Sequence, residues 1–193
     1  MLKTTPNRAG EVLTFWEEAG PEMWYKQDDG FDRTIRDRFG ALWDAAAEGA
    51  CDGWAAGPRG ALALLILLDQ FPRNMFRQSP RAFATDGRAL RMADMALGQG
   101  WDLRILPPLR QFFYLPFMHS EQLTHQDRSV RLFKARMEEG GNLLHARAHR
   151  EVIRRYGRFP YRNAALGRVS RPEEEAFLAD GGYGAIVREL EGA

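Results

Sequence analysis

The run Ala61 to Leu68 (ALALLILL) is the feature that most constrains the fold of this chain. Eight consecutive apolar residues are far fewer than the roughly 20 that a helix needs to cross a bilayer. Gly57-Pro58 supplies a helix start just before the run, and polar side chains gather just after it. Because a helix that is apolar on nearly every side must be buried, we expect a central helix over Pro58 to Phe71.

Helical periodicity recurs along the rest of the chain. Val12, Phe15, Trp16 and Ala19, for example, share one helical face after Pro6. Further helices are predicted at 29–49, 80–98, 106–118, 124–139 and 142–156, from Ser170 and from Tyr183. No stretch alternates apolar and polar residues convincingly, so we expect negligible strand. The prediction is an all-α single domain over residues 1–193, with about eight or nine helices in antiparallel pairs, packed as a compact bundle or short superhelix.

Composition excludes several classes of partner. Lys plus Arg number 27 and Asp plus Glu 26, so no overall field attracts nucleic acid or an anionic membrane. Cys51 is a lone cysteine and the first ten residues hold no apolar stretch, which together favour a cytoplasmic protein. There is no glycine-rich phosphate loop, no nucleophile elbow and no pair of thiolates. No cofactor, nucleic acid or membrane partner is therefore expected.

Three segments carry a family resemblance: LDQFPRNMFR (68–77), FFYLPFMHSE (112–121), and RYGRFPYRN (155–163) with LGR (166–168). They resemble the signature of an uncharacterised, mostly bacterial family catalogued as domain of unknown function 924, over about Val12 to Leu190. The resemblance implies a tetratricopeptide-like fold, a right-handed superhelix of helix pairs, and no established activity. Tyr161 stands where the family is expected to carry histidine, which counts against any mechanism that requires an imidazole at that position.

Polar residues at the end of the apolar helix form the first candidate site. Isolated charges there would be costly to bury and need partners. Two interpretations stay open, ion pairs that hold a tight turn at Pro72, or a shared ligand site. The residues concerned are Asp69, Gln70, Arg73, Asn74 and Arg77.

A second candidate set follows in the predicted helix 106–118. Arg110, Tyr114 and Glu121 are spaced by three- and four-residue steps that place them on one helical face, with His119 beside it. His119-Ser120-Glu121 is not predicted to be a hydrolytic triad, since neighbours in sequence point in different directions on a helix.

Two histidines one turn apart, His145 and His149, have a spacing that can serve a metal. No glutamate lies in the required place and no third ligand is indicated, so no metal site is predicted. His149 resembles the histidine that precedes the 155–163 motif in the family, and it is instead expected to face that loop.

The loop from Gly157 to Val169 mixes arginines with aromatic residues. Arg158, Arg162 and Arg168, with Asn163, could hold phosphate or carboxylate through forked hydrogen bonds. The same arginines could instead lock the loop to helix ends, and grip on RNA is a third interpretation that the neutral net charge disfavours.

The leading functional hypothesis is a polar pocket for a small anionic molecule or peptide. Its catalytic candidates are His119 and His149 as general acid or base. Its ligand-binding candidates are Asp69, Arg73, Asn74, Arg77, Arg110, Tyr114, Glu121, Arg158, Arg162 and Asn163. The alternative is a noncatalytic adaptor that binds a peptide in an open groove with exposed aromatics such as Trp24, Trp54 and Trp101.

Overall fold

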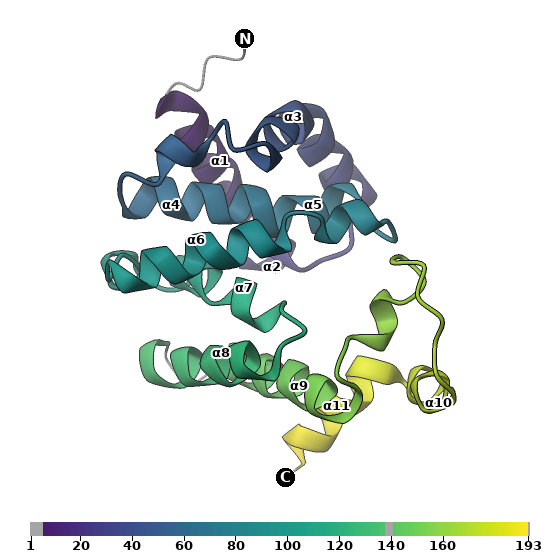
Figure 1. The fold of residues 1–193 in the computed structure, drawn as a ribbon. Coiled ribbons are helices and arrows are strands. Elements are labelled where there is room, and N and C mark those ends of the chain that lie inside the picture. The colour runs from purple at the N-terminus through teal and green to yellow at the C-terminus, as the bar shows by residue number, and fades with distance from the viewer. Residues whose placement is uncertain (1–5, 138–140, 193) are drawn as a thin grey trace. The chain divides into compact units, whose positions relative to one another are not determined.

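The computed structural model describes residues 6–137 and 141–192, and all regular secondary structure in these ranges is helical (Figure 1). The prediction of an all-α chain is confirmed for them. Eight of the labelled α-helices within these ranges have eight residues or more. None of the helices there is long and apolar enough to span a membrane.

Two compact units emerge from the contacts between elements. The first contains 6–77 and 81–113, and the second contains 78–80, 114–137 and 141–192. The single domain expected from the sequence stays a prediction beside this division.

The first unit is built around the predicted apolar helix. Every residue from Ala61 to Leu68 is inaccessible to solvent. The helix α4 (Pro58–Leu65) packs against both α1 (Pro6–Ala19) and α6 (Asp86–Gly98). In Figure 1, α4 and α5 continue along one line. The α-helices of this unit are α1 (Pro6–Ala19), α2 (Pro21–Trp24), α3 (Asp29–Ala47), α4 (Pro58–Leu65), α5 (Phe71–Met75) and α6 (Asp86–Gly98).

A π-helical turn, Ile66–Gln70, joins α4 to α5. Pro72 explains it, because proline has no N–H and its ring would clash with the carbonyl of Leu68 in a regular α-helix. That carbonyl accepts a hydrogen bond from the Thr85 hydroxyl at 2.5 Å instead. The helix thus passes a proline without leaving a buried carbonyl unsatisfied.

Helix starts test the capping predictions. The sequence offers Asp28 or Asp29 as the cap of α3, and the structure shows Asp28, whose Oδ1 accepts a hydrogen bond from the N–H of Phe31 at 2.9 Å. The predicted helix start at Ser79-Pro80 is wrong. Pro80–Phe83 is a 3-10 turn, and α6 begins only at Asp86.

The predicted helix Leu106 to Met118 is also wrong as one α-helix. A 3-10 segment, Leu109–Phe113, is followed by the short helix α7 (Leu115–Met118). Pro116 accounts for the break, because its ring would clash with the carbonyl of Phe112 in a continuous α-helix.

The second unit consists of α7, two long helices and a C-terminal pair. α8 (Leu123–Arg136) packs against α9 (Gly141–Tyr156), and α9 packs against α11 (Gly182–Glu191). α10 (Pro172–Ala179) lies against α11 and the 3-10 turn Pro160–Arg162. The predicted end of α8 near Glu139 lies outside the described residues. The core comprises Ala148, Val152, Ile153, Phe159, Phe177 and Ile186.

Candidate functional site

Asn74 and Arg77 in the first unit hold one buried carboxylate. Asp32 on α3 is 5% exposed. Its Oδ1 accepts hydrogen bonds from Asn74 Nδ2 at 2.8 Å and Arg77 Nη2 at 2.9 Å, and its Oδ2 accepts a further short contact from Arg77 Nε. These contacts tie α3 to α5 and to the residues that follow α5.

Arg73 joins two carboxylates in the same unit. Its Nη1 and Nη2 donate to the two carboxylate oxygens of Asp86 at 2.9 and 3.0 Å, and Nη1 lies 3.3 Å from Asp69 Oδ1. Asp69 is 1% exposed and also accepts a short hydrogen bond from the side chain of Gln70. The guanidinium thereby links the π-helical turn to the start of α6.

Arg110, Tyr114 and Glu121 do not share a helical face, because the α-helix predicted through them is interrupted. Arg110 Nε donates to the carbonyls of Ile105 at 2.9 Å and Asp102 at 3.1 Å, inside the first unit. Tyr114 belongs to the second unit, where it is fully buried in an edge-to-face contact with Phe133.

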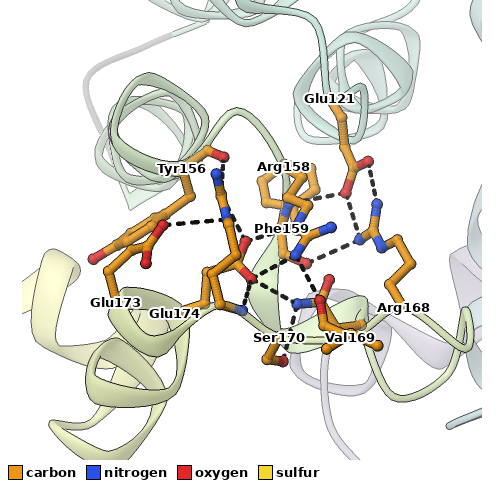
Figure 2. Close-up of polar contacts among 11 residues, drawn as sticks. Glu121, Tyr156, Arg158, Phe159, Arg168, Val169, Ser170, Glu173 and Glu174 are labelled. Atoms are coloured by element: carbon orange, nitrogen blue, oxygen red, sulfur yellow. Dashed lines mark hydrogen bonds and ion pairs between the residues drawn. The ribbon is translucent and has the colours of Figure 1, made fainter.

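Glu174 on α10 is the centre of an ion-pair network in the second unit (Figure 2). Although the carboxylate is fully buried, it accepts hydrogen bonds from Arg158 Nε and Nη2, both at 2.6 Å. Arg171 adds its backbone N–H and Nη2, each at 2.8 Å, and Asn163 adds Nδ2 at 3.1 Å. Hydrogen bonds from Arg158 hold the pKa of Glu174 well below its usual range, against the opposing effect of burial.

Glu121 is held in a similar way. Its carboxylate accepts the N–H of Phe159 at 2.8 Å and a two-pronged pair from Arg168 at 2.7 and 3.0 Å (Figure 2). Burial opposes ionisation of Glu121, but these hydrogen bonds lower its pKa overall. The two networks fasten both ends of the Gly157 to Val169 loop, so Arg158, Asn163 and Glu121 have structural roles in it.

The catalytic candidates His119 and His149 come together in the second unit. Their ring centroids lie 6.3 Å apart in an edge-to-face arrangement. Both rings are partly exposed. His149 also contacts Phe159 edge-to-face, with centroids 5.5 Å apart, so it faces the 155–163 loop as expected.

Two tyrosines complete this group. Tyr183 on α11 lies against His149 with ring centroids 4.8 Å apart, and its hydroxyl is 2.7 Å from Nδ1 of His145. Tyr161 stacks on Phe159 and contacts Tyr183 edge-to-face. We call His119, His145, His149, Phe159, Tyr161 and Tyr183 the histidine–tyrosine cluster.

The tautomer of His149 follows from one hydrogen bond. Nδ1 lies 2.9 Å from the carbonyl oxygen of His145, and a carbonyl can only accept, so Nδ1 carries the proton. Nε2 of the neutral ring is then the lone-pair acceptor. Several effects together lower the pKa of His149 to about 3. Burial is the largest, and the positive charges of His119, Arg162 and His145 act in the same direction, while the hydrogen bond to the His145 carbonyl opposes them. The ring is neutral at physiological pH.

Arg162 is the loop arginine that contacts the histidine–tyrosine cluster. It is 6% exposed, its Nη1 donates to the carbonyl of His119 at 3.0 Å, and its guanidinium lies 4.3 Å from the ring centroid of Phe159. Arg158 and Arg162 therefore belong to different environments despite their shared loop. Arg158 serves Glu174, whereas Arg162 lies beside the histidine–tyrosine cluster.

The sequence predicts only His119 and His149 of this cluster as site residues. It offers His145 only as a metal ligand, Phe159 only as an aromatic residue of the arginine loop, and Tyr161 as a departure from the family pattern. Tyr183 is 38 residues from its partner His145, and no local pattern connects the two. Within the described ranges, no group of three or more histidine, cysteine or carboxylate side chains could hold a metal ion.

Two aromatic residues expected in a peptide groove are buried. Trp24 is 4% exposed and Trp54 is 8% exposed. Trp24 packs against Trp16 and Phe112 in the core of the first unit. These two indoles are therefore not the exposed aromatics that would favour a peptide-binding groove.

Comparison with known proteins identifies the family. No protein with a curated description matches the chain. A solved structure of a protein of unknown function from Agrobacterium tumefaciens is similar, with a TM-score of 0.85 and 43% identity over 89% of this chain and 97% of that one. The model of a family described as bacterial protein of unknown function, DUF924, matches residues 12–182. The chain therefore belongs to this bacterial family, domain of unknown function 924.

Proposed function

We propose that the histidine–tyrosine cluster, together with Arg162, binds a small anionic substrate and exchanges protons with it through His149 and His119. The observation that carries the proposal is the arrangement around His149. Its ring lies 6.3 Å from that of His119 between centroids, and Arg162 donates to the carbonyl of His119 at 3.0 Å. The charges of His119, Arg162 and His145 all lower the pKa of His149. A neutral imidazole among potential cations favours an anion as its ligand.

The proposed chemistry begins from the neutral ring of His149. Its Nδ1–H donates to the His145 carbonyl, so Nε2 is the nitrogen that can accept a hydrogen bond or a proton. A bound anion raises the pKa of His149, since it offsets the neighbouring positive charge. His149 then becomes a stronger base only when the ligand is present, and His119, 6.3 Å away between ring centroids, is the second group that can donate or accept.

The ligand set is narrower than the one predicted from sequence. Asp69, Arg73, Asn74, Arg77, Arg110, Glu121, Arg158 and Asn163 all engage internal partners, and Tyr114 is buried. Arg162 also donates to a carbonyl, that of His119, but we retain it because this contact places it beside the histidine–tyrosine cluster. We also propose that the activity is cytoplasmic, as expected from the lone cysteine. The tetratricopeptide-like superhelix remains a proposed description of the fold.

The test is a titration of the imidazole nitrogens by NMR, with and without inorganic phosphate or malonate. We expect one of the anions to raise the pKa of His149 and to shift the resonances of His119. Arg162→Lys should weaken this response of the histidines to the anion several-fold. The reason is that lysine has a single ammonium group, whereas the arginine guanidinium can donate two parallel hydrogen bonds to the anion. Arg147→Lys is the matched control, as Arg147 is an exposed arginine on α9. The proposal is overturned if neither anion affects the two histidines, or if both lysine variants respond alike.

A further inference from the structure

His119, one of the two proposed proton-exchange residues, is the C-cap of the short helix α7. The last carbonyls of an α-helix have no partner within the helix, so other groups have to satisfy them. The ring of His119 lies 6.3 Å from that of His149 between centroids. The donors that hold the end of α7 therefore decide where the second imidazole of the proposed site lies.

Three consecutive carbonyls at the end of α7 accept hydrogen bonds from side chains. Those of Met118 and Ser120 each accept from Nε2 of Gln126, both at 2.6 Å. That of His119 accepts from Arg162 Nη1 at 3.0 Å. All of these residues belong to the second unit. One amide group thus holds the backbone on both sides of His119.

Gln126 reaches this segment because of its position in α8. It is the fourth residue of that helix and is fully buried. A side chain on a helix leans toward the N-terminus of its own helix, so the amide lies over the connection that precedes α8. Both partners are carbonyls, which can only accept, so the NH₂ group faces them and the orientation of the amide is fixed. Its two N–H groups match the two carbonyls.

Stability alone does not account for this side chain. The amide oxygen Oε1 of Gln126 is buried and has no donor among the described residues. A buried polar atom without a partner costs free energy, so an apolar residue of the same size would serve packing as well. The hydrogen bonds that Gln126 makes through its side chain all go to the two carbonyls that flank His119. Its contacts therefore serve the position of that residue.

We propose that Gln126 is a positioning residue that fixes His119 beside His149 in the histidine–tyrosine cluster. This role rests on the proposed function, since it concerns the same site. Gln126 acts through the backbone of residues 118–120 and not by touching the anion.

His149 reports on the position of His119. Burial is the largest cause of the lowered pKa of His149, and the charge of His119 is the next. If His119 moves away, the pKa of His149 should rise. A loss of stability that leaves His119 in place would not change this pKa.

The first measurement uses the wild-type protein. By NMR, the side-chain amide protons of Gln126 should exchange with solvent at least about tenfold more slowly than those of Gln122. Gln122 is the matched control, because it is an exposed glutamine at the N-cap of the same helix. Equal exchange rates would show that the amide of Gln126 is not held by the two carbonyls and would overturn the proposal.

Variants then test the positioning. Gln126→Met keeps the size of the side chain and removes both donors, whereas Gln126→Asn keeps an amide that is too short to reach both carbonyls. In each we expect a higher pKa of His149, and in Gln126→Met an affinity for phosphate or malonate about tenfold weaker. Gln126→Asn gives the same test if Gln126→Met does not fold. Ser129→Ala is the matched control, since Ser129 is also fully buried on α8 and its hydroxyl has no partner among the described residues.

The results separate the role of Gln126 from the proposed function. A higher pKa of His149 in the Gln126 variants, but not in Ser129→Ala, supports the role of Gln126. An unchanged pKa of His149 in a folded Gln126 variant overturns that role, even if the wild type binds an anion. A wild type that responds to neither anion overturns the proposed function, while the pKa of His149 in the Gln126 variants still tests the positioning of His119.

Discussion

Two environments in the second unit show how one loop can serve stability and chemistry at once. Around Glu174 a buried carboxylate meets two arginines and an asparagine, so its charge is compensated and its hydrogen-bonding capacity is used. Around His149 the groups whose charges lower its pKa are His119, Arg162 and His145, and the ring stays neutral. Paired charges stabilise a structure, whereas a neutral base beside cationic groups suits the anionic ligand proposed above.

The largest effect is expected at Glu174. Glu174→Ala removes the acceptor of five hydrogen bonds and leaves Arg158 and Arg171 without it, so we expect about 3 kcal/mol of destabilisation. Urea unfolding measures this difference. Glu175→Ala, at an exposed position of the same helix, should change stability by less than about 0.5 kcal/mol. Similar unfolding free energies for the two variants would show that the ion pairs of Glu174 do not stabilise the protein.

Arg158 and Arg162 sharpen the same comparison. Arg158→Ala should destabilise the protein in the direction of Glu174→Ala, since it leaves the buried carboxylate with fewer donors. Arg162→Lys should have a smaller effect on stability, because the charge is kept, while the response of His149 to anions is reduced. A larger urea effect for Arg162→Lys than for Arg158→Ala would reverse the assignment of the two arginines.

The next effect is a pH dependence. The pKa of His149 is about 3 in the folded protein and about 6.5 in the unfolded chain. Between these values the unfolded state binds more protons than the folded state. The contribution of His149 to the free energy of unfolding is therefore complete above pH 6.5 and is lost as the pH falls toward 3. We expect a loss of about 2 kcal/mol between pH 6.5 and 4.5, allowing for the partial exposure of the ring.

His149→Phe removes the pH-dependent contribution of His149 to stability. The lowered pKa values of Glu174 and Glu121 act only below about pH 4.5, so the window above it reports His149. Unfolding free energies of the variant should depend less on pH between 6.5 and 4.5 than those of the wild type. His125→Phe removes a histidine on α8 outside the cluster and is the matched control. Equal pH dependence in wild type and His149→Phe would show that His149 is readily protonated.

The smallest effect concerns Tyr183. Tyr183→Phe removes the hydroxyl that lies 2.7 Å from His145 Nδ1 but keeps the ring against His149. We expect a loss of about 0.5–1 kcal/mol in unfolding free energy. In an NMR titration the resonances of His145 should change more than those of His149. The reverse order would show that the hydroxyl acts mainly on His149.

Helices were predictable where their signals are local. The apolar run after Pro58, the cap at Asp28 and the spacing of His145 and His149 on α9 all depend on neighbours within one or two helical turns. The failures at Ser79-Pro80 and over Leu106 to Met118 have the same origin. Proline both starts helices and interrupts them, and only the surrounding packing decides which outcome holds.

The sequence by itself determined the helical class, the family and the types of residue available for a site. It offered Arg158 and Arg162 as equivalent loop arginines, and nothing in it separates Glu174 from its neighbours Glu173 and Glu175. Tertiary structure decided that Arg158 belongs to Glu174 and Arg162 to the surroundings of His149 and His119. It also brought Tyr183 to His145 across 38 residues. The physical reason is that helix signals act between near neighbours along the chain, whereas ion pairs, ring contacts and pKa shifts depend on distances in space that folding alone establishes.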